Sequence, residues 1–186
     1  GDGPSLERGI REAMKAGVLF ERPDPVLPGY TFTQSLVQEV AERTLLIRRR
    51  RELHRLAMDA IETLYPDELS AHAEGLTRHA IGAEDWEAAT RYALLAAERA
   101  AAGYSTREAL RHYDLGLEAA EHLDLTAAPL IRCELLAGRG RMLWNIGQVD
   151  DSAAAFHAAL DVARHPSFAE AALAANRLDP RRWQAR

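Results

Sequence analysis

Histidines are the residues of this chain whose spacing first suggests chemistry. His72 and His79 lie in the segment HAEGLTRH, and histidine pairs are common zinc ligands. On a helix these two positions lie about 10 Å apart along the axis, which is too far for one zinc ion, and the segment is not an HExxH motif. We therefore expect packed or solvated histidines, and we predict that these 186 residues hold no metal site and no cofactor site.

Nucleophilic catalysis is the second chemistry to consider. Cys133 is the only cysteine and lies in the segment IRCELLAG, where no organised base is identifiable, and the chain has no Gly-x-Ser-x-Gly motif. We expect a core thiol, no catalytic residues and a protein that is not an enzyme. A single cysteine also excludes an intrachain disulfide, which favours a reducing compartment such as the cytoplasm.

A run of arginines is the most conspicuous charged feature and could contact DNA phosphates. The chain as a whole has a net charge of -5, which does not favour a surface built for nucleic acid. Asp59 lies one helical turn after Arg55, and the segment ERPDPVLPG has one arginine against two acids. Direct DNA binding is therefore the less favoured interpretation, and an intramolecular contact is the alternative. The arginines concerned are Arg48, Arg49, Arg50, Arg51 and Arg55.

The composition favours closely packed helices as the elements that position these residues. Hydrophobic residues make up 47% of the chain but aromatic residues only 6%, and alanine dominates the apolar set. No apolar run approaches the roughly 20 residues of a membrane span. We therefore predict a helical protein that does not cross a membrane.

Apolar periodicity and helix breakers predict the individual elements. Ser5 is the expected N-cap of a first helix that ends at Gly17, and VLFER and YTFT predict a hairpin near 18–33. The residues Asp179 and Pro180 resemble the start of a further helix, so we expect the chain to be a fragment. An amphipathic helix is predicted over 47–67, and further helices over 68–82, 85–102, 105–122, 127–146, 149–164 and 167–177.

The segment LLAGRGRMLWNIGQVDDSAAAFHAAL resembles a tetratricopeptide repeat. Gly140 would let two helices approach, Gly147 would end the first helix, and Phe156 would fill the space between them. Ser152 stands where the pattern usually has alanine. Degenerate copies are visible in HAEGLTRHAIGAEDWEAATRYALLAAERA and GYSTREALRHYDLGLEAA. We therefore predict an all-α fold, an antiparallel solenoid of tetratricopeptide-like repeats over 68–186, with a small hairpin near the N-terminus.

The segment YTFTQSLVQEVAERTLLIRRRRELHRLAMDAIETLY resembles the region that joins a winged-helix module to tetratricopeptide repeats in bacterial signal-transduction ATPases. These proteins are related to LuxR-type and maltose-activator-type regulators and to cyclase-linked ATPases. The resemblance implies a partial winged-helix module over 1–46 and a connecting helix over 47–67. No GxxxxGK[ST] motif is present, so ATP is implied only for an upstream domain. The residues that carry the resemblance are Phe32, Leu36, Val37, Glu39, Val40, Arg49, Arg50, Leu53, His54 and Arg55.

A repeat array of this kind has a concave face suited to binding a peptide or a small ligand. Trp144 has two interpretations, since its indole would either contribute to the groove or pack between helices. We expect a sensor or relay segment of a multidomain bacterial regulator, which binds a protein partner or small inducer and contacts an upstream ATPase domain. A free-standing scaffold and a winged-helix DNA binder remain as alternatives. The candidate groove residues are Glu74, Arg78, Glu134, Arg141, Trp144 and Asn145.

Overall fold

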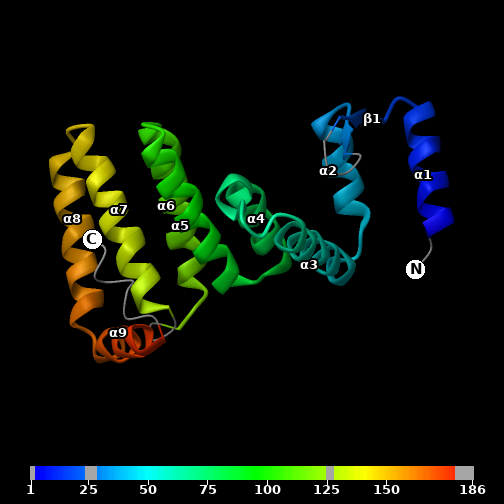
Figure 1. Ribbon diagram of the computed structural model, residues 1–186. Helices are drawn as coiled ribbons and strands as arrows, with labels where there is room; N and C mark the ends of the chain where they lie inside the picture. The colour runs from blue at the N-terminus through cyan, green and yellow to red at the C-terminus, as the bar shows by residue number, and fades with distance from the viewer. Residues whose placement is uncertain (1–2, 24–28, 125–127, 179–186) are drawn as a thin grey trace. The chain divides into compact units, whose positions relative to one another are not determined.

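The computed structural model describes residues 3–23, 29–124 and 128–178 of the 186-residue chain. Contacts divide the chain into two compact units, Gly1–Arg50 and Arg51–Arg186. Helices predominate in the described ranges, together with an antiparallel hairpin (Figure 1). The predicted helical class and the predicted hairpin are therefore confirmed. Asp179 and Pro180 lie outside the described residues.

The first unit consists of a helix, the hairpin and a second helix. Leu19 pairs with Phe32 in the hairpin, and the Thr33 hydroxyl donates to the carbonyl oxygens of Gly17 and Val18 at 2.6 and 2.9 Å. Gly17 has a φ of +69° and follows the first helix, as predicted. The elements are α1 (Gly3–Lys15), β1 (Leu19–Arg22), β2 (Gly29–Phe32) and α2 (Ser35–Thr44).

Ser5 is not the N-cap of α1, because the helix begins at Gly3. Pro4 lies at the start of the helix, where its fixed φ suits the backbone and its missing N–H leaves no bond unmade. The observed helix therefore begins before the predicted N-cap.

The second unit is a succession of helices joined by short connections (Figure 1). Each predicted range agrees with an observed helix to within a few residues. Among the described residues, no helix combines the length and the apolar content that a membrane crossing requires. The helix α3 (Ile47–Leu64) contains the boundary between the units and is followed by α4 (Leu69–Ala83), α5 (Trp86–Ala102), α6 (Thr106–Glu121), α7 (Pro129–Asn145), α8 (Val149–Arg164) and α9 (Pro166–Leu178).

Small side chains dominate the interior of the second unit. Ala89, Ala93, Ala97 and Ala109 are fully buried, and their single methyl groups allow the helix backbones to approach closely. The helix α5 packs against both α4 and α6, and α7 packs against α6, α5 and α8. Larger side chains occupy the remaining space, namely Met58, Leu76, Tyr92, Tyr113, Leu135, Met142 and Leu143.

The α7–α8 hairpin accounts for the glycines that interrupt the helical pattern. A Cβ atom at Gly140 would lie 3.0 Å from the ring of Phe156, so the glycine gives this ring its place against α7. Gly147 has a φ of +79° and ends α7. The Ser152 hydroxyl is buried and donates to the carbonyl oxygen of Gly140 at 2.9 Å. The serine thus connects the two helices where alanine would make no such bond.

Candidate ligand-binding groove

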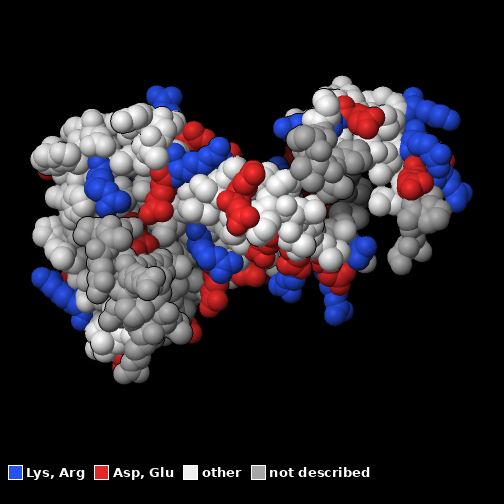
Figure 2. Space-filling model, viewed as in Figure 1, with Lys and Arg blue, Asp and Glu red and all other residues white. Residues whose placement is uncertain are grey.

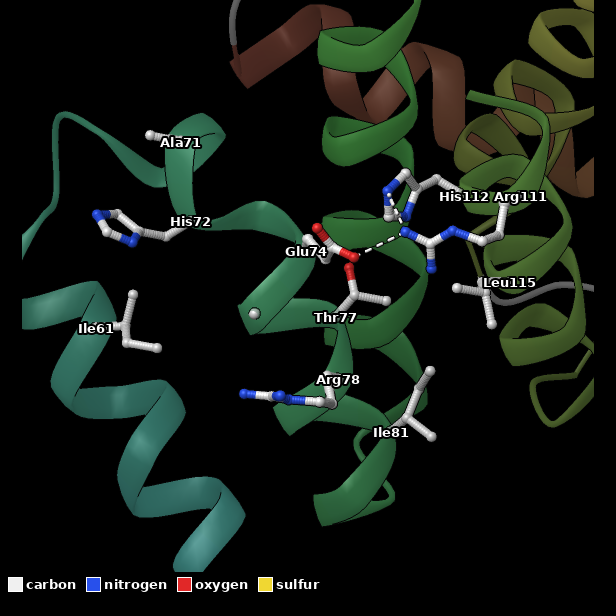
Figure 3. Close-up of a pocket in the computed structure, with 11 residues that line it drawn as sticks. Ile61, Ala71, His72, Glu74, Thr77, Arg78, Ile81, Arg111, His112 and Leu115 are labelled. Atoms are coloured by element: carbon white, nitrogen blue, oxygen red, sulfur yellow. Dashed lines mark hydrogen bonds and ion pairs between the residues drawn. The ribbon is translucent and has the colours of Figure 1, made fainter. Parts of the chain in front are cut away.

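A groove of about 550 Å³ lies over α4 and is lined by residues of α3, α4 and α6 (Figure 3). This volume is within the range of small-molecule and peptide sites. Ile61, Ile81 and Leu115 provide apolar surface, and the polar part includes Glu74 and Arg111. The lining therefore suits an amphipathic ligand that carries both apolar and charged groups. Other lining residues are Ala71, His72, Gly75, Thr77, Arg78 and His112.

Arg111 connects α6 to α4, two of the three helices that line the groove. Its Nη2 atom donates to Glu74 Oε1 at 2.7 Å and lies 3.1 Å from His112 Nε2 (Figure 3). The side chains of Arg111 and Glu74 are 50% and 65% exposed, so solvent screens the ion pair, which contributes at most about 1 kcal/mol to stability. A ligand can therefore compete for either partner at little energetic cost.

Arg78 lies one turn after Glu74 on α4 and also lines the groove. It is exposed and makes no hydrogen bond or ion pair within the described parts of the chain. Its guanidinium is thus available to a carboxylate or phosphate, to which arginine binds through two parallel hydrogen bonds.

His112 is the buried polar residue of the site, with 2% of its surface exposed. Burial lowers the pKa of His112, the charge of Arg111 lowers it further, and Glu74 and Glu108 oppose this shift. The imidazole is therefore neutral at neutral pH. Because Arg111 donates to Nε2, the proton of the neutral ring is on Nδ1, which is buried and has no hydrogen-bond partner among the described residues. An unsatisfied buried donor of this kind costs about 1–3 kcal/mol.

A second hollow of about 330 Å³ adjoins the groove and shares Glu74 and His112 with it. It lies between α4, α5 and α6, where Arg99 Nη1 donates to the carbonyl oxygen of Ala71 at 2.7 Å. Glu108 lines this hollow one helical turn before His112. Glu74 and His112 thus lie where the two hollows meet.

The structure brings together only part of the predicted groove. Glu74 and Arg78 line the groove over α4. The four other candidates belong to α7 and line neither hollow. Trp144 is 62% exposed, so the interpretation of this residue as a core side chain is wrong. The four α7 candidates are Glu134, Arg141, Trp144 and Asn145.

Sequence reasoning missed Arg111, His112 and Glu108. A signal was present, since Glu108 and His112 are four residues apart and share one face of the helix. Ala109 and Tyr113 beside them are buried, whereas Glu108 is exposed, so the spacing alone could not show which of the two polar side chains is buried.

The five arginines of the predicted patch all lie on α3. Arg51 pairs with Glu84 of α4, and both side chains are 45% exposed. Asp59 lies one helical turn after Arg55, but no ion pair joins the two side chains among the described residues. On the face shown in Figure 2, acidic and basic side chains are interspersed within each unit. Arg48, Arg49 and Arg50 belong to the first unit, whereas Arg51 and Arg55 belong to the second.

His72, His79 and Cys133, which were considered for metal binding or catalysis and set aside, contact neighbouring groups. The His72 ring lies 4.3 Å from the ring of Tyr65, measured between centroids, and His79 Nδ1 lies 3.0 Å from His54 Nδ1. Cys133 is half-buried with its Sγ atom 3.6 Å from the carbonyl oxygen of Ala159. Burial raises the pKa of the Cys133 thiol, and Glu134 adds to the effect, so the unreactive protonated form is favoured.

Comparisons of the chain with models of protein families, with curated proteins and with solved structures gave no match.

Proposed function

We propose that the chain is a non-enzymatic sensor or relay segment of a multidomain bacterial regulator, and that it binds a protein partner or small inducer. The observation that carries this proposal is the groove over α4, where apolar side chains from three helices border the exposed guanidinium groups of Arg78 and Arg111. The volume of the groove and the mixed polarity of its lining support a recognition site. An acidic ligand with an apolar part is the chemistry that such a lining would recognise.

The packing of the second unit supports a repeat-based module as the carrier of this site. The helix α7 contacts both α6 and α5, as the first helix of a repeat contacts the preceding pair in a tetratricopeptide array. The close approach of Phe156 to Gly140 and the positive φ of Gly147 support the same proposal. The sequence resemblance of the N-terminal segment adds the proposal that an ATPase domain lies upstream, with which this chain makes an intramolecular contact.

Ligand binding is tested by measuring the melting temperature of the chain with amino acids, dicarboxylates, sugar phosphates and short acidic peptides. A ligand of the groove should bind about tenfold more weakly, a change of about 1.4 kcal/mol, after Arg78→Ala. Arg107→Ala is the matched control, because Arg107 is exposed on α6 and does not line the groove. If no compound in the panel raises the melting temperature, or if R78A and R107A bind alike, the groove is not the binding site.

The alternative function is that of a free-standing scaffold, which would hold partner proteins in the same groove and would need no nucleotide cycle. Antiserum to this chain would measure the size of the native polypeptide in the source cell. A product several times larger than 20.6 kDa supports the multidomain regulator, because typical domains contain about 100–150 residues. A product near that mass supports the scaffold.

Direct DNA binding is the third candidate, based on the arginines of α3. Phosphate contacts weaken steeply as salt rises, so a titration with nonspecific duplex at low and high salt tests it. Affinity that does not change with salt contradicts this function.

A further inference from the structure

We propose that Glu74, Glu108 and His112 form a binding site for a divalent transition-metal ion of the zinc class, and that this ion replaces the guanidinium of Arg111. One ligand atom from each of the three residues lies within 4.8 Å of the others. The inference concerns the junction of the two hollows and does not depend on which ligand the groove over α4 binds.

The backbone already places the three ligands correctly. Glu108 and His112 are one helical turn apart on α6 and so project from one face, while Glu74 reaches the same point from α4. Ligand atoms of a tetrahedral zinc ion lie about 3.4 Å apart, as bonds of about 2.1 Å require. Both glutamates are exposed, so rotation of their side chains can close the remaining distance without a movement of the helices.

His112 is the observation that points to a ligand rather than to a surface cluster of acids. The ring is buried, it extends from α6 toward Glu74 (Figure 3), and its Nε2 atom, which carries no proton, lies 3.1 Å from the same Arg111 Nη2 atom that binds Glu74.

Arg111 shows where the cation would lie. Its Nη2 atom is 2.7 Å from Glu74 Oε1 and 3.1 Å from His112 Nε2, so a positive charge already occupies the space between two of the three ligands. Half of the Arg111 side chain is exposed, and it can turn into solvent when a metal ion enters. A divalent ion then neutralises the charges of the two carboxylates.

The donor set selects the class of ion. One imidazole nitrogen and two carboxylates suit zinc, cobalt, nickel or manganese, whereas magnesium and calcium prefer oxygen ligands alone. Water would complete the coordination, because three protein ligands leave a position open. Zinc is the probe for affinity, and cobalt is the probe for the geometry of the ligands.

The experiment is a calorimetric titration of the full 186-residue chain, without any histidine tag, with zinc chloride at pH 7.5. We expect saturable binding of about one ion per chain. Glu108→Gln should weaken it by about tenfold or more, because even outer-shell partners of a metal contribute about 10-fold to 100-fold to affinity. Glu118→Gln is the matched control, an exposed glutamate on the same helix that lies outside the cluster.

Arg111→Ala gives the most discriminating result. It removes the competing cation and should therefore raise the affinity for zinc several-fold, whereas it should weaken an acidic ligand of the groove over α4. Arg78→Ala should leave zinc binding unchanged and weaken only that ligand. The two proposals can thus fail independently. His112→Gln should abolish zinc binding, and a circular dichroism melt checks that this variant folds.

Several outcomes overturn the site. The first is a failure to saturate below about 1 mM zinc, which corresponds to a binding free energy of about 4 kcal/mol or less. The second is an affinity for zinc that is unchanged in E108Q. The third is an affinity in R111A that is equal to or lower than that of the unaltered chain. Binding abolished by His79→Gln would place the ion at the pair of His54 and His79 instead. A cobalt complex that lacks the absorption of a low-symmetry site in the visible range would also contradict the proposed ligand set.

Discussion

Gly138 of α7 lies directly against the ring of Tyr113 of α6. A Cβ atom at Gly138 would overlap Cε1 of Tyr113, and Tyr113 is only 1% exposed, so the ring has no free space into which it can move. We predict that Gly138→Ala lowers the free energy of unfolding by about 1–3 kcal/mol, as overpacked cores do, in spite of the better helix propensity of alanine. Urea denaturation followed by circular dichroism measures the change.

Gly75→Ala is the matched control for this prediction. A Cβ atom at Gly75 meets no atom within 4 Å, and this position also lies inside a helix. Alanine there should raise the free energy of unfolding by about 0.5–1 kcal/mol, because it lowers the entropy of the unfolded chain. If the two variants change stability equally, the close contact between α6 and α7 is not the cause.

Trp144 provides a test of the surface of α7. The side chain is 62% exposed, so Trp144→Ala should change the free energy of unfolding by no more than about 0.5 kcal/mol. A core tryptophan would lose about 3–5 kcal/mol on the same substitution. Leu143→Ala, at the buried neighbouring position, should be destabilised by about 2–5 kcal/mol and serves as the comparison.

His112 should make the stability of the chain depend on pH in the acid range. Burial lowers the pKa of His112 from its ordinary value of 6.5, so the unfolded chain binds the proton more readily than the folded chain. The stability that neutral His112 contributes is therefore present above pH 6.5, and it is lost as the pH falls through the lower pKa that His112 has in the folded chain. The loss cannot exceed about 1.4 kcal/mol for each pH unit.

Urea denaturation of the chain and of His112→Gln at pH 7.5 and 5.5 measures this effect. The groups that face the ring, Arg111, Glu74 and Glu108, are unchanged in the variant. We expect the unaltered chain to lose more stability than H112Q between the two pH values. Equal losses would contradict the prediction.

Asp85 should stabilise the start of α5. Its carboxylate accepts a hydrogen bond from the backbone N–H of Ala88 at 3.1 Å, as an N-cap residue does. Asp85→Ala should lower the free energy of unfolding by about 0.5–2 kcal/mol, and Asp85→Asn should retain most of the stability. Guanidinium denaturation of the three proteins checks this, and an asparagine variant as unstable as the alanine variant would exclude capping.

The helices and the turns between them follow from local features of the sequence. The period of apolar residues and the positions of glycine, proline and capping residues act within about one helical turn, so no distant contact is needed to predict them. The start of α1 shows the limit of this reasoning, because Ser5 and Pro4 both signal a helix start, and only one of them determines where it begins.

The candidate site, likewise, was predicted from the sequence only in part. Glu74 and Arg78 were predicted because the repeat pattern assigns a face to each helix. Arg111 and His112 of α6 come close to Glu74 of α4 because α5 packs against both α4 and α6, and this packing involves buried alanines of α5, such as Ala89 and Ala93, that are distant in sequence from Glu74 and His112.

The sequence alone thus determined the helices, the hairpin and the tight turn at Gly147, since these depend on neighbouring residues and on backbone conformation. The tertiary structure decided that His112 is buried beside Arg111, that Trp144 is exposed, and that the α7 candidates line neither hollow. Which polar groups meet depends on how closely helices approach and how they rotate against one another, and this is set by the packing of many small side chains together.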